Sequence, residues 1–427
     1  MTRILIPILL ALLAPSVAIA QSPPVRLTLA DAISRGFETS HRIAEARARE
    51  QGARAAVHSA ELATKPTVSA NAGYVRTNHV EEFAFPQPGG ARVVVYPDIP
   101  DNWMSRLSFQ WPIYTSGRTD ALERAAVAEA QAASADIETS RADLRFEIVR
   151  AYCGVATALD AVRVLEESSA RSEAQLRDAR QLYAVGLTPP NEVAGFEAQR
   201  SNERAQLIQA QNLRDSALID LRRLTGLPQD TIVDLADALD IAVGPPAAFA
   251  GDRLVAEALD SRAERKALTF RLGGAEARQE AASKGNKPTV AVTGGVDYAN
   301  PNPRHFPRRD AFQRSWDLGI AVNWNVIDWG RARSQTAEAA AAVSATRERL
   351  AEFDTIVSAD VRQRALDLNS SQAILAAAGD AVTSAAESRR VLGDRFAAGV
   401  ATSTDVLVAQ VQLLEAQLAR TRALANV

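Results

Sequence analysis

The stretch that decides the fold is residues 116–184, which read SGRTDALERAAVAEAQAASADIETSRADLRFEIVRAYCGVATALDAVRVLEESSARSEAQLRDARQLYA. It contains no proline, and its only glycines are Gly117 and Gly154. At about 1.5 Å per residue, a continuous helix of this length would extend roughly 100 Å, far beyond the usual helix of a compact domain. The stretch therefore predicts a tube, a stalk or a coiled coil.

Apolar residues recur along this stretch at steps of three and four. The small ones are Ala121, Ala125, Ala128, Ala132 and Ala135, and the larger ones that continue the seam are Leu144, Ile148, Ala151, Val155, Leu159 and Val162. Residues at this spacing share one helix face, so a neighbouring helix can approach closely. The periodicity indicates how the helix packs but not its function. On this stretch alone, a plain rod without a conduit is therefore as well supported as a tunnel.

Residues 1–20 have the parts of a secretory signal peptide: Arg3, the apolar run 4–14 and an Ala-x-Ala sequence at 18–20. We expect the mature chain to begin near Gln21. The apolar run is well short of the about 20 residues that span a bilayer as a helix, and no later run approaches that length. An exported chain of this kind is expected in the periplasm, the medium or the outer membrane.

Charge and proline positions outline the rest of the chain. The net charge is −3 and no long basic run is present, which argues against nucleic acid as a partner. Long proline-free runs that predict helices cover residues 28–64, 116–184, 191–227 and 252–283, and two more follow Trp329 with a break at Gly399.

The chain also repeats itself at a constant offset. An offset of 213 residues carries Trp103 to Trp316, Trp111 to Trp324, Gly117-Arg118 to Gly330-Arg331, Tyr183 to Phe396, Gly186 to Gly399 and Glu192 to Asp405. Upstream, Lys65 and the three residues after it recur from Lys287 at an offset of 222. We therefore expect two structural repeats, 21–227 and 252–427, joined by a linker at 228–251.

Each repeat is expected to contain a helix, a β-hairpin, a long helix and a further helix. The hairpins are expected at 66–114 and 288–327, the long helices at 116–184 and 330–398, and the further helices at 189–225 and 402–427.

The strands are indicated by segments that alternate with a period of two. In 103–113 the odd positions read Trp, Ser, Leu, Phe, Trp and Ile, and in 316–326 the even positions read Trp, Leu, Ile, Val, Trp and Val. Weaker alternation precedes them at 68–74 and 290–298. Together these segments predict four half-buried strands in two hairpins.

The tryptophans distinguish a membrane sheet from an ordinary soluble sheet. Trp103 and Trp111 are 8 residues apart, as are Trp316 and Trp324. In tilted strands, this spacing gives about 20 Å along the membrane normal, close to the roughly 25 Å apolar band between the aromatic girdles of outer-membrane barrels. Four strands cannot close a barrel and lipid does not tolerate an open edge, so we expect an oligomer with four strands from each copy.

Three motifs are the most specific marks in the sequence. They are Tyr183-Ala-Val-Gly186-Leu187 followed by Glu192-Val193, Phe396-Ala-Ala-Gly399-Val400 followed by Asp405-Val406-Leu407, and the run 114–118 with its partner 328–331. Through them the chain resembles the TolC-type outer-membrane efflux proteins, from about Leu27 to its last residue. The resemblance implies a mainly α fold with a transmembrane β-barrel, in which a homotrimer forms one 12-stranded barrel continuous with an α-helical periplasmic tunnel.

The resemblance also implies roles for residues at two helix tips. The residues that correspond to adaptor-contacting tips are Val185, Gly186, Leu187, Gly399 and Val400, and those at the periplasmic entrance are Glu192, Asp405, Tyr183 and Phe396. By themselves the residues leave simpler readings open. Each glycine suits a tight turn, and a carboxylate near a helix N-terminus interacts favourably with the helix dipole.

Catalytic motifs are absent from the sequence: the histidines lack metal-ligand spacing, and no P-loop or nucleophile elbow occurs. We expect no enzyme activity, cofactor or metal. The expected protein is a passive duct in outer-membrane lipid, with its tunnel in the periplasm, for tripartite efflux or type I secretion. Its expected partners are a periplasmic adaptor and an inner-membrane pump of RND, ABC or MFS type. The alternative is a soluble periplasmic coiled-coil adaptor or scaffold without a pore.

Overall fold

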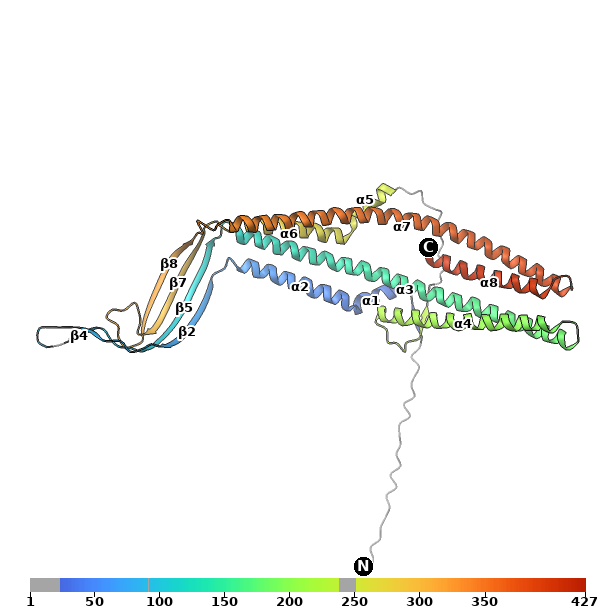
Figure 1. Cartoon of the computed structure of the whole chain (residues 1–427), viewed down its shortest axis with the longest axis horizontal. Coiled ribbons are helices and arrows are strands. Elements are labelled where there is room, and N and C mark those ends of the chain that lie inside the picture. Colours follow the sequence, from blue (N-terminus) through green and yellow to red (C-terminus); the bar gives the residue numbers. More distant parts are fainter. Residues whose placement is uncertain (1–23, 91, 238–250) are drawn as a thin grey trace, which may run out of the picture. The chain divides into compact units, whose positions relative to one another are not determined.

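The computed structural model describes residues 24–90, 92–237 and 251–427, so the expected signal peptide and most of the expected linker lie outside it. Long helices dominate the described part, as the sequence predicts (Figure 1). The helices are α1 (Leu29–Thr39), α2 (His41–Leu62), α3 (Arg118–Ala184), α4 (Pro190–Thr225), α5 (Gly251–Ser261), α6 (Ala263–Ser283), α7 (Arg331–Ala397) and α8 (Ser403–Asn426). The strands are β1 (Val25–Leu27), β2 (Thr67–Arg76), β3 (Phe83–Pro86), β4 (Arg92–Tyr96), β5 (Asp101–Tyr114), β6 (Val233–Leu235), β7 (Thr289–Asn300) and β8 (Gln313–Asn323).

The described chain divides into two compact units. One contains the strands β2 to β5, β7 and β8, the helices α2, α5 and α6, and the first parts of α3 and α7 up to residues 143 and 367. The other contains α1, β1, α4, β6, α8 and the remaining parts of α3 and α7. We call them the sheet unit and the tip unit.

The sheet unit is built on an antiparallel four-stranded sheet in the order β2-β5-β7-β8. These are the four strands that the alternating pattern predicts, and the β5–β7 pairing joins the two hairpins. The alternation did not identify β3 and β4, which pair with each other within the segment between β2 and β5.

The expected strand 316–326 is wrong at its end, because β8 stops at Asn323 and leaves Trp324 beyond it. The last pair of the β7–β8 ladder joins Thr289 to Asn323. Pro288 precedes Thr289 and has no N–H, so the ladder cannot continue with a further donor from that residue.

Two expected helices are each broken into two. The run 28–64 forms α1 and α2, which are separated at Ser40 (φ −69°, ψ 117°), and the run 252–283 forms α5 and α6, which are separated at Arg262 (φ −64°, ψ 124°). The first break coincides with the boundary between the two units, since α1 belongs to the tip unit and α2 to the sheet unit. The breaks are 222 positions apart, the offset that relates Lys65 to Lys287, so they are a feature of the repeat.

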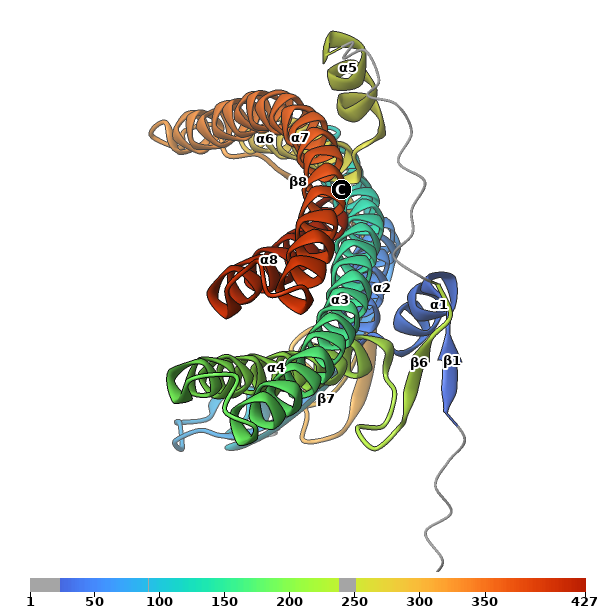
Figure 2. The same cartoon turned by 90° about the vertical axis from the view of Figure 1, so that its right-hand side faces the viewer.

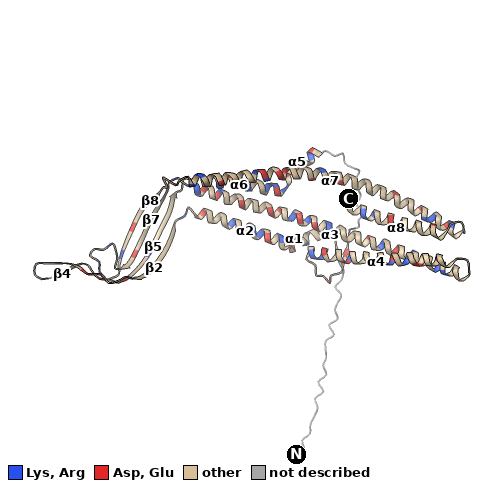
Figure 3. Cartoon of the chain, viewed as in Figure 1, with Lys and Arg blue, Asp and Glu red and all other residues tan. Residues whose placement is uncertain are grey.

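Charged side chains of both signs are interspersed along the helices of the sheet unit (Figure 3). Helix α6 is linked to the first part of α3 by ion pairs from Arg271 to Asp136 and from Arg124 to Glu280. It is linked to α7 by Arg265, whose Nε lies 2.8 Å from Oδ1 of Asp354. These pairs are partly or fully exposed, so each contributes little to stability and the helix faces are solvated.

In the tip unit, α8 packs against both α3 and α4. Its Leu414 joins buried Val162 and Ala210, and its Leu407 packs on buried Leu176 and Phe196. Figure 2 shows α4 alongside the last part of α3, and α1 beside β1 and β6.

A buried polar network accompanies this packing. Glu203 of α4 is fully buried, and its carboxylate accepts hydrogen bonds from Oγ of Ser172 (2.7 Å) and Nε2 of Gln199 (2.9 Å). Gln410 of α8 donates through Nε2 to Oγ of Ser172 at 2.6 Å. Because a buried carboxylate is costly without such partners, the network favours one register of α8 against α3 and α4.

Candidate functional site

The first group of candidate residues lies at the two turns that end α3 and α7. Gly186 and Gly399 have φ values of +76° and +74°, the left-handed conformation that glycine adopts without penalty. The amide of Leu187 donates to the Leu182 carbonyl at 2.9 Å, and the amide of Val400 donates to the Arg395 carbonyl at 2.9 Å. These bonds close both helices in the same way, so the two tips are repeats of one structure.

The tips expose apolar side chains. Val185, Leu187 and Val400 are 70%, 74% and 76% exposed. Large apolar groups at this exposure are characteristic of contact sites for another molecule when they gather in one place. The structure therefore leaves the expected adaptor-contacting residues accessible, and their role stays a prediction.

Glu192 and Asp405 begin the helices that follow the tips, but their local bonding differs. Asp405 forms a capping box with Thr402: its Oδ2 accepts from the Thr402 amide (2.9 Å) and hydroxyl (2.7 Å), and its own amide donates to Thr402 Oγ1 (3.2 Å). The equivalent N-cap of α4 is Pro189, which makes no side-chain cap. Asp405 thus has the helix-capping role that the sequence left open, while Glu192 lacks that arrangement.

The capping box predicts a pH dependence at the start of α8. The hydrogen bonds from Thr402 hold the pKa of Asp405 below its usual value. Its stabilising contribution is therefore present above the ordinary aspartate pKa and is lost as the pH falls through the lowered one. We expect the protection of the amides in the first turn of α8 against hydrogen exchange, relative to the intrinsic rate at each pH, to fall over this acidic range more than at the start of α4.

Thr402→Val is the control for this measurement because it removes the hydroxyl that donates to Asp405. In that variant the protection of the first-turn amides should be lower at neutral pH and should change less on acidification. Equal acid responses in the parent and in Thr402→Val would contradict the capping assignment.

Tyr183 and Phe396 occupy equivalent positions before the two tips. Tyr183 is exposed and Phe396 is half-buried. Within the described chain, no hydrogen bond or ion pair joins Tyr183, Phe396, Glu192 and Asp405 to one another. A single copy therefore does not assemble these four residues into one site.

The second group of candidates is the set of tryptophans near the sheet. Trp103 and Trp111 belong to β5, Trp316 belongs to β8 and Trp324 follows it; all four are exposed. The indole N–H of Trp111 donates to the Thr64 carbonyl, and that of Trp324 donates to the Asn286 carbonyl, both at 3.1 Å. Each indole N–H is bonded to a carbonyl that lies just before a strand of the sheet. An aromatic ring whose polar atom is bonded at the end of a sheet suits a boundary between lipid and water.

The strand register places these rings in staggered rows. Trp111 lies opposite Val292, which lies opposite Ile320, and Trp324 is four residues further along the chain, just past the end of β8. Trp316 is displaced by the same amount. It lies opposite Val296, which lies opposite Leu107, and Leu107 is four residues after Trp103. Equal stagger in both pairs is a property of a sheet whose strands are inclined, as barrel strands are. The interfacial placement of the rings remains a prediction.

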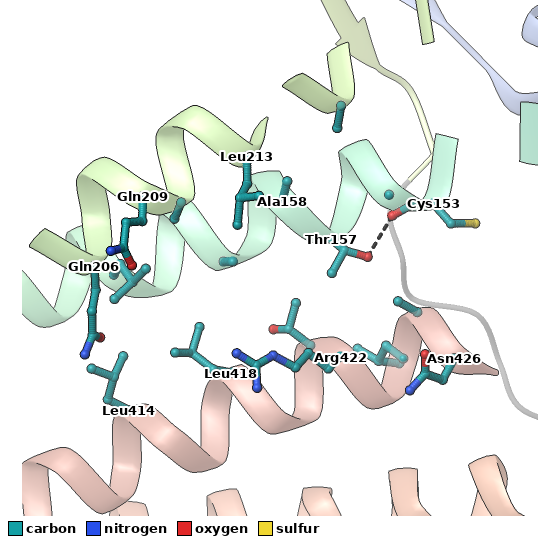
Figure 4. Close-up of a pocket in the computed structure, with 18 of the residues that line it drawn as sticks. Cys153, Thr157, Ala158, Gln206, Gln209, Leu213, Leu414, Leu418, Arg422 and Asn426 are labelled. Carbon is teal, nitrogen blue, oxygen red and sulfur yellow. Dashed lines mark hydrogen bonds between the residues drawn. The ribbon is translucent and has the colours of Figure 1, made fainter. Parts of the chain in front are cut away.

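A large cleft lies in the tip unit, between α8 and the helices α3 and α4 (Figure 4). Its volume is about 1430 Å³, and Leu213, Leu414, Leu418 and Arg422 are among the residues that line it. The Cys153 thiol also lies there, and burial raises its pKa, which disfavours the nucleophilic thiolate. The cleft therefore offers a packing surface between three helices.

Metal-binding chemistry has no support in the described ranges, where no three His, Cys, Asp or Glu side chains gather closely enough to hold an ion. Within the same residues, none of the helices is long and apolar enough to cross a membrane.

Sequence reasoning missed two side-chain groups. One is the buried Glu203 network of the tip unit. The other lies on the sheet, where Arg106 of β5 binds Asp297 of β7 (Nη1–Oδ2, 2.8 Å) and Asp317 of β8 (Nη2–Oδ1, 2.9 Å). The signal for the second group was the polar character of Arg106 and Asp317 within the two alternating segments.

Comparison with known proteins agrees with this arrangement. The family model described as "Outer membrane efflux protein" matches residues 32–227 and 254–427. The chain is 26% identical over 400 residues to the outer membrane protein TolC of Vibrio cholerae, covering 91% of this chain and 85% of that protein.

Two solved channels share the fold. The CmeC outer membrane channel of Campylobacter jejuni has a TM-score of 0.77 and 15% identity, over 93% of this chain and 82% of that one. The outer membrane protein VceC of Vibrio cholerae has a TM-score of 0.75 and 20% identity, over 93% and 92%. With two helical repeats, equivalent glycine tips and a family match over most of its length, this chain belongs to the outer membrane efflux protein family.

Proposed function

We propose that three copies of this chain form the outer-membrane exit duct of an efflux pump, in which twelve strands close one barrel. The observation that carries the proposal is the four-stranded sheet with β2 and β8 at its edges. The N–H and C=O groups of these edges need partners in lipid. Pairing β8 of one copy with β2 of the next would supply them and would leave no edge in a closed ring.

The two faces of the sheet support a barrel wall. One face carries Trp103, Leu107, Trp111, Trp316 and Ile320, which are all exposed in the single chain. The opposite face is polar: a hollow of about 220 Å³ on the sheet is lined by Thr67, Ser69, Ser108, Gln110 and Thr293, among others. An apolar outside and a polar inside are what a water-filled membrane barrel requires. A soluble scaffold, the alternative function, would leave the apolar face unexplained.

Exposed apolar residues on the helices of the tip unit support assembly independently. Phe146 of α3 and Ile208, Leu213 and Ile219 of α4 are all more than half exposed. Contact with helices of a neighbouring copy would remove this apolar surface from water. We infer that the tunnel wall is completed between copies.

We further propose which part of the duct each segment of the chain forms. Residues 21–227 and 252–427 act as two repeats, and the loops between β2 and β5 and between β7 and β8 face outward. The tips then face the periplasm, where Val185, Gly186, Leu187, Gly399 and Val400 would meet a periplasmic adaptor. The chain has no energy-coupling site of its own in this scheme, so an inner-membrane pump, of RND, ABC or MFS type, would drive transport.

The proposal predicts the electrical behaviour of the purified protein in a planar bilayer. Glu192 and Asp405 from three copies would place a ring of carboxylates at the entrance, and such rings favour cations. We expect small, cation-selective currents that multivalent cations block from the tip side. Glu192→Gln and Asp405→Asn should each weaken the selectivity and the block, and the double variant should weaken them most.

Val408→Asn, which adds no charge and lies on the same helix, is the control and should leave the selectivity unchanged. Absence of any current from the assembled wild type would contradict the duct. Anion selectivity would contradict the carboxylate ring while leaving the duct in place.

A further inference from the structure

We propose that the loop between β7 and β8 narrows the outer mouth of the duct, and that Arg304 sets its bore by fastening the loop to the polar face of the sheet. This inference rests on the proposed function, because the polar face must line the lumen. It assigns a size- and charge-determining role to Arg304 and Asp317.

The anchor is a charge cluster on the polar face. Arg106 lies opposite Asp297 in the register, and its guanidinium binds Asp297 through Nη1 and Asp317 through Nη2. To reach Asp317 it crosses Gly295, where a Cβ atom would come within 2.6 Å of Nη2 and 2.8 Å of Cζ. A larger residue at this point of β7 would displace the Arg106 guanidinium from Asp317, so Gly295 leaves room for this ion pair.

The loop folds back onto this cluster. Arg304 donates through Nη2 to Oδ1 of Asp317 at 2.7 Å and through Nη1 to the Trp316 carbonyl at 2.9 Å. Its Nε lies 3.9 Å from Oδ2 of Asp297, which belongs to the strand inside β8. Since Arg304 reaches past the edge strand, it covers the face of the sheet and does not merely extend the edge.

Asn302 holds the base of the same loop. It is fully buried, and its Nδ2 donates to the Gln313 carbonyl (2.9 Å) and to Oγ of Ser315 (3.1 Å). Its Oδ1 accepts from the Arg304 amide at 2.9 Å. Ser315 lies opposite Asp297, so it is on the polar face too. The loop is thus attached at two successive points of that face.

Three copies would carry three such loops around one lumen. Each cluster combines two arginines with two aspartates, so its formal charge is balanced. Removing either Arg304 or the Asp317 carboxylate would free the loop, and the two changes would leave lumenal charges of opposite sign. A change in the width of the mouth should therefore be the same in both variants, whereas a change in ion selectivity should have opposite signs.

The test measures how fast reagents reach a lumenal thiol from outside intact cells. The thiol is introduced as Gln110→Cys, and Cys153→Ser removes the native thiol. Gln110 lies on the polar face of β5, four residues further from the β7–β8 loop than Arg106. The probes are a small membrane-impermeant sulfonated maleimide and a long poly(ethylene glycol) maleimide. We expect the small reagent to label the parent and the long one to label it slowly.

In Arg304→Ala and in Asp317→Asn, labelling by the long reagent should become about tenfold faster, the scale of a lost charge-assisted hydrogen bond. Arg309→Ala removes the same charge from an exposed position in the same loop and should not change the rate. In bilayers, Arg304→Ala should shift the selectivity toward cations and Asp317→Asn toward anions. Heat-resistant oligomers on gels establish that each variant assembles.

The outcomes separate the two proposals. If the long reagent labels the parent and all variants at the same rate, the loop does not narrow the mouth and this inference fails alone. If the small reagent fails to label Gln110→Cys in every assembled variant, the polar face is not lumenal, and the barrel assignment fails with it.

Discussion

Replacing Leu107 or Ile320 by arginine is expected to cost about 2 to 4 kcal/mol of stability in the membrane and to prevent assembly. Leu107 is 51% exposed and Ile320 is 71% exposed, and both lie on the apolar face of the sheet. Leu107 is in the middle of β5, where it lies opposite Ala70 and Val296. In the proposed barrel an arginine there would meet hydrocarbon, whereas an exposed position of a soluble sheet would accept it.

The measurement is the fraction of the protein recovered as heat-resistant oligomer in outer-membrane fractions. Gln110→Arg is the matched control, because it places the same side chain on the polar face of the same strand. We expect the control to assemble normally and the two lipid-face variants to be lost. Normal assembly of both lipid-face variants would remove the barrel assignment.

Charged residues at the helix tips are expected to abolish pump-dependent efflux while the oligomer stays in the membrane. Bulky or charged residues at Gly186 and Gly399 should have this effect, but their positive φ angles mean that most side chains also strain the turn. The sharper change is the combination Val185→Asp, Leu187→Asp and Val400→Asp, which alters exposed side chains. It should lower pump-dependent export to the level of a strain without the protein.

The control for the tip experiment separates docking from folding. Gly186→Asn and Gly399→Asn introduce a residue that tolerates the left-handed conformation, so the turns should form and part of the efflux should remain. Valine at the same positions should disturb the turns themselves. Full efflux in the triple aspartate variant, with normal membrane levels, would show that the partner binds elsewhere.

Local chemistry explains why much of this fold could be predicted from the sequence. Helix α3 has no proline within it, and it ends next to a glycine that can adopt positive φ and before a proline that suits the first turn of α4. The four strands of the sheet show a period of two because one face is apolar and the other polar. The repeat is likewise a property of the linear sequence. Glu192 and Asp405 could be placed at helix starts for the same reason.

Other features depend on contacts between distant segments and have no local signal. The break at Ser40 contains neither glycine nor proline, and it coincides with the boundary between the tip unit and the sheet unit. The different bonding of Asp405 and Glu192 is local by contrast, because it follows from the N-cap three residues before each carboxylate, Thr402 in one case and Pro189 in the other.

The sequence by itself therefore determined the long helices and the four strands of the sheet, because each follows from residues within one or two turns or pleats of each other. It determined the repeat through a constant offset, but it did not determine the helix breaks at Ser40 and Arg262. Only the tertiary structure decided the strand register, which brings Arg106 to Asp297 and Asp317 from two other strands. It also decided the packing of α8, which brings Gln410 to Ser172. Such pairs form because burial and strand pairing align whole elements, and a one-residue shift in register would separate them.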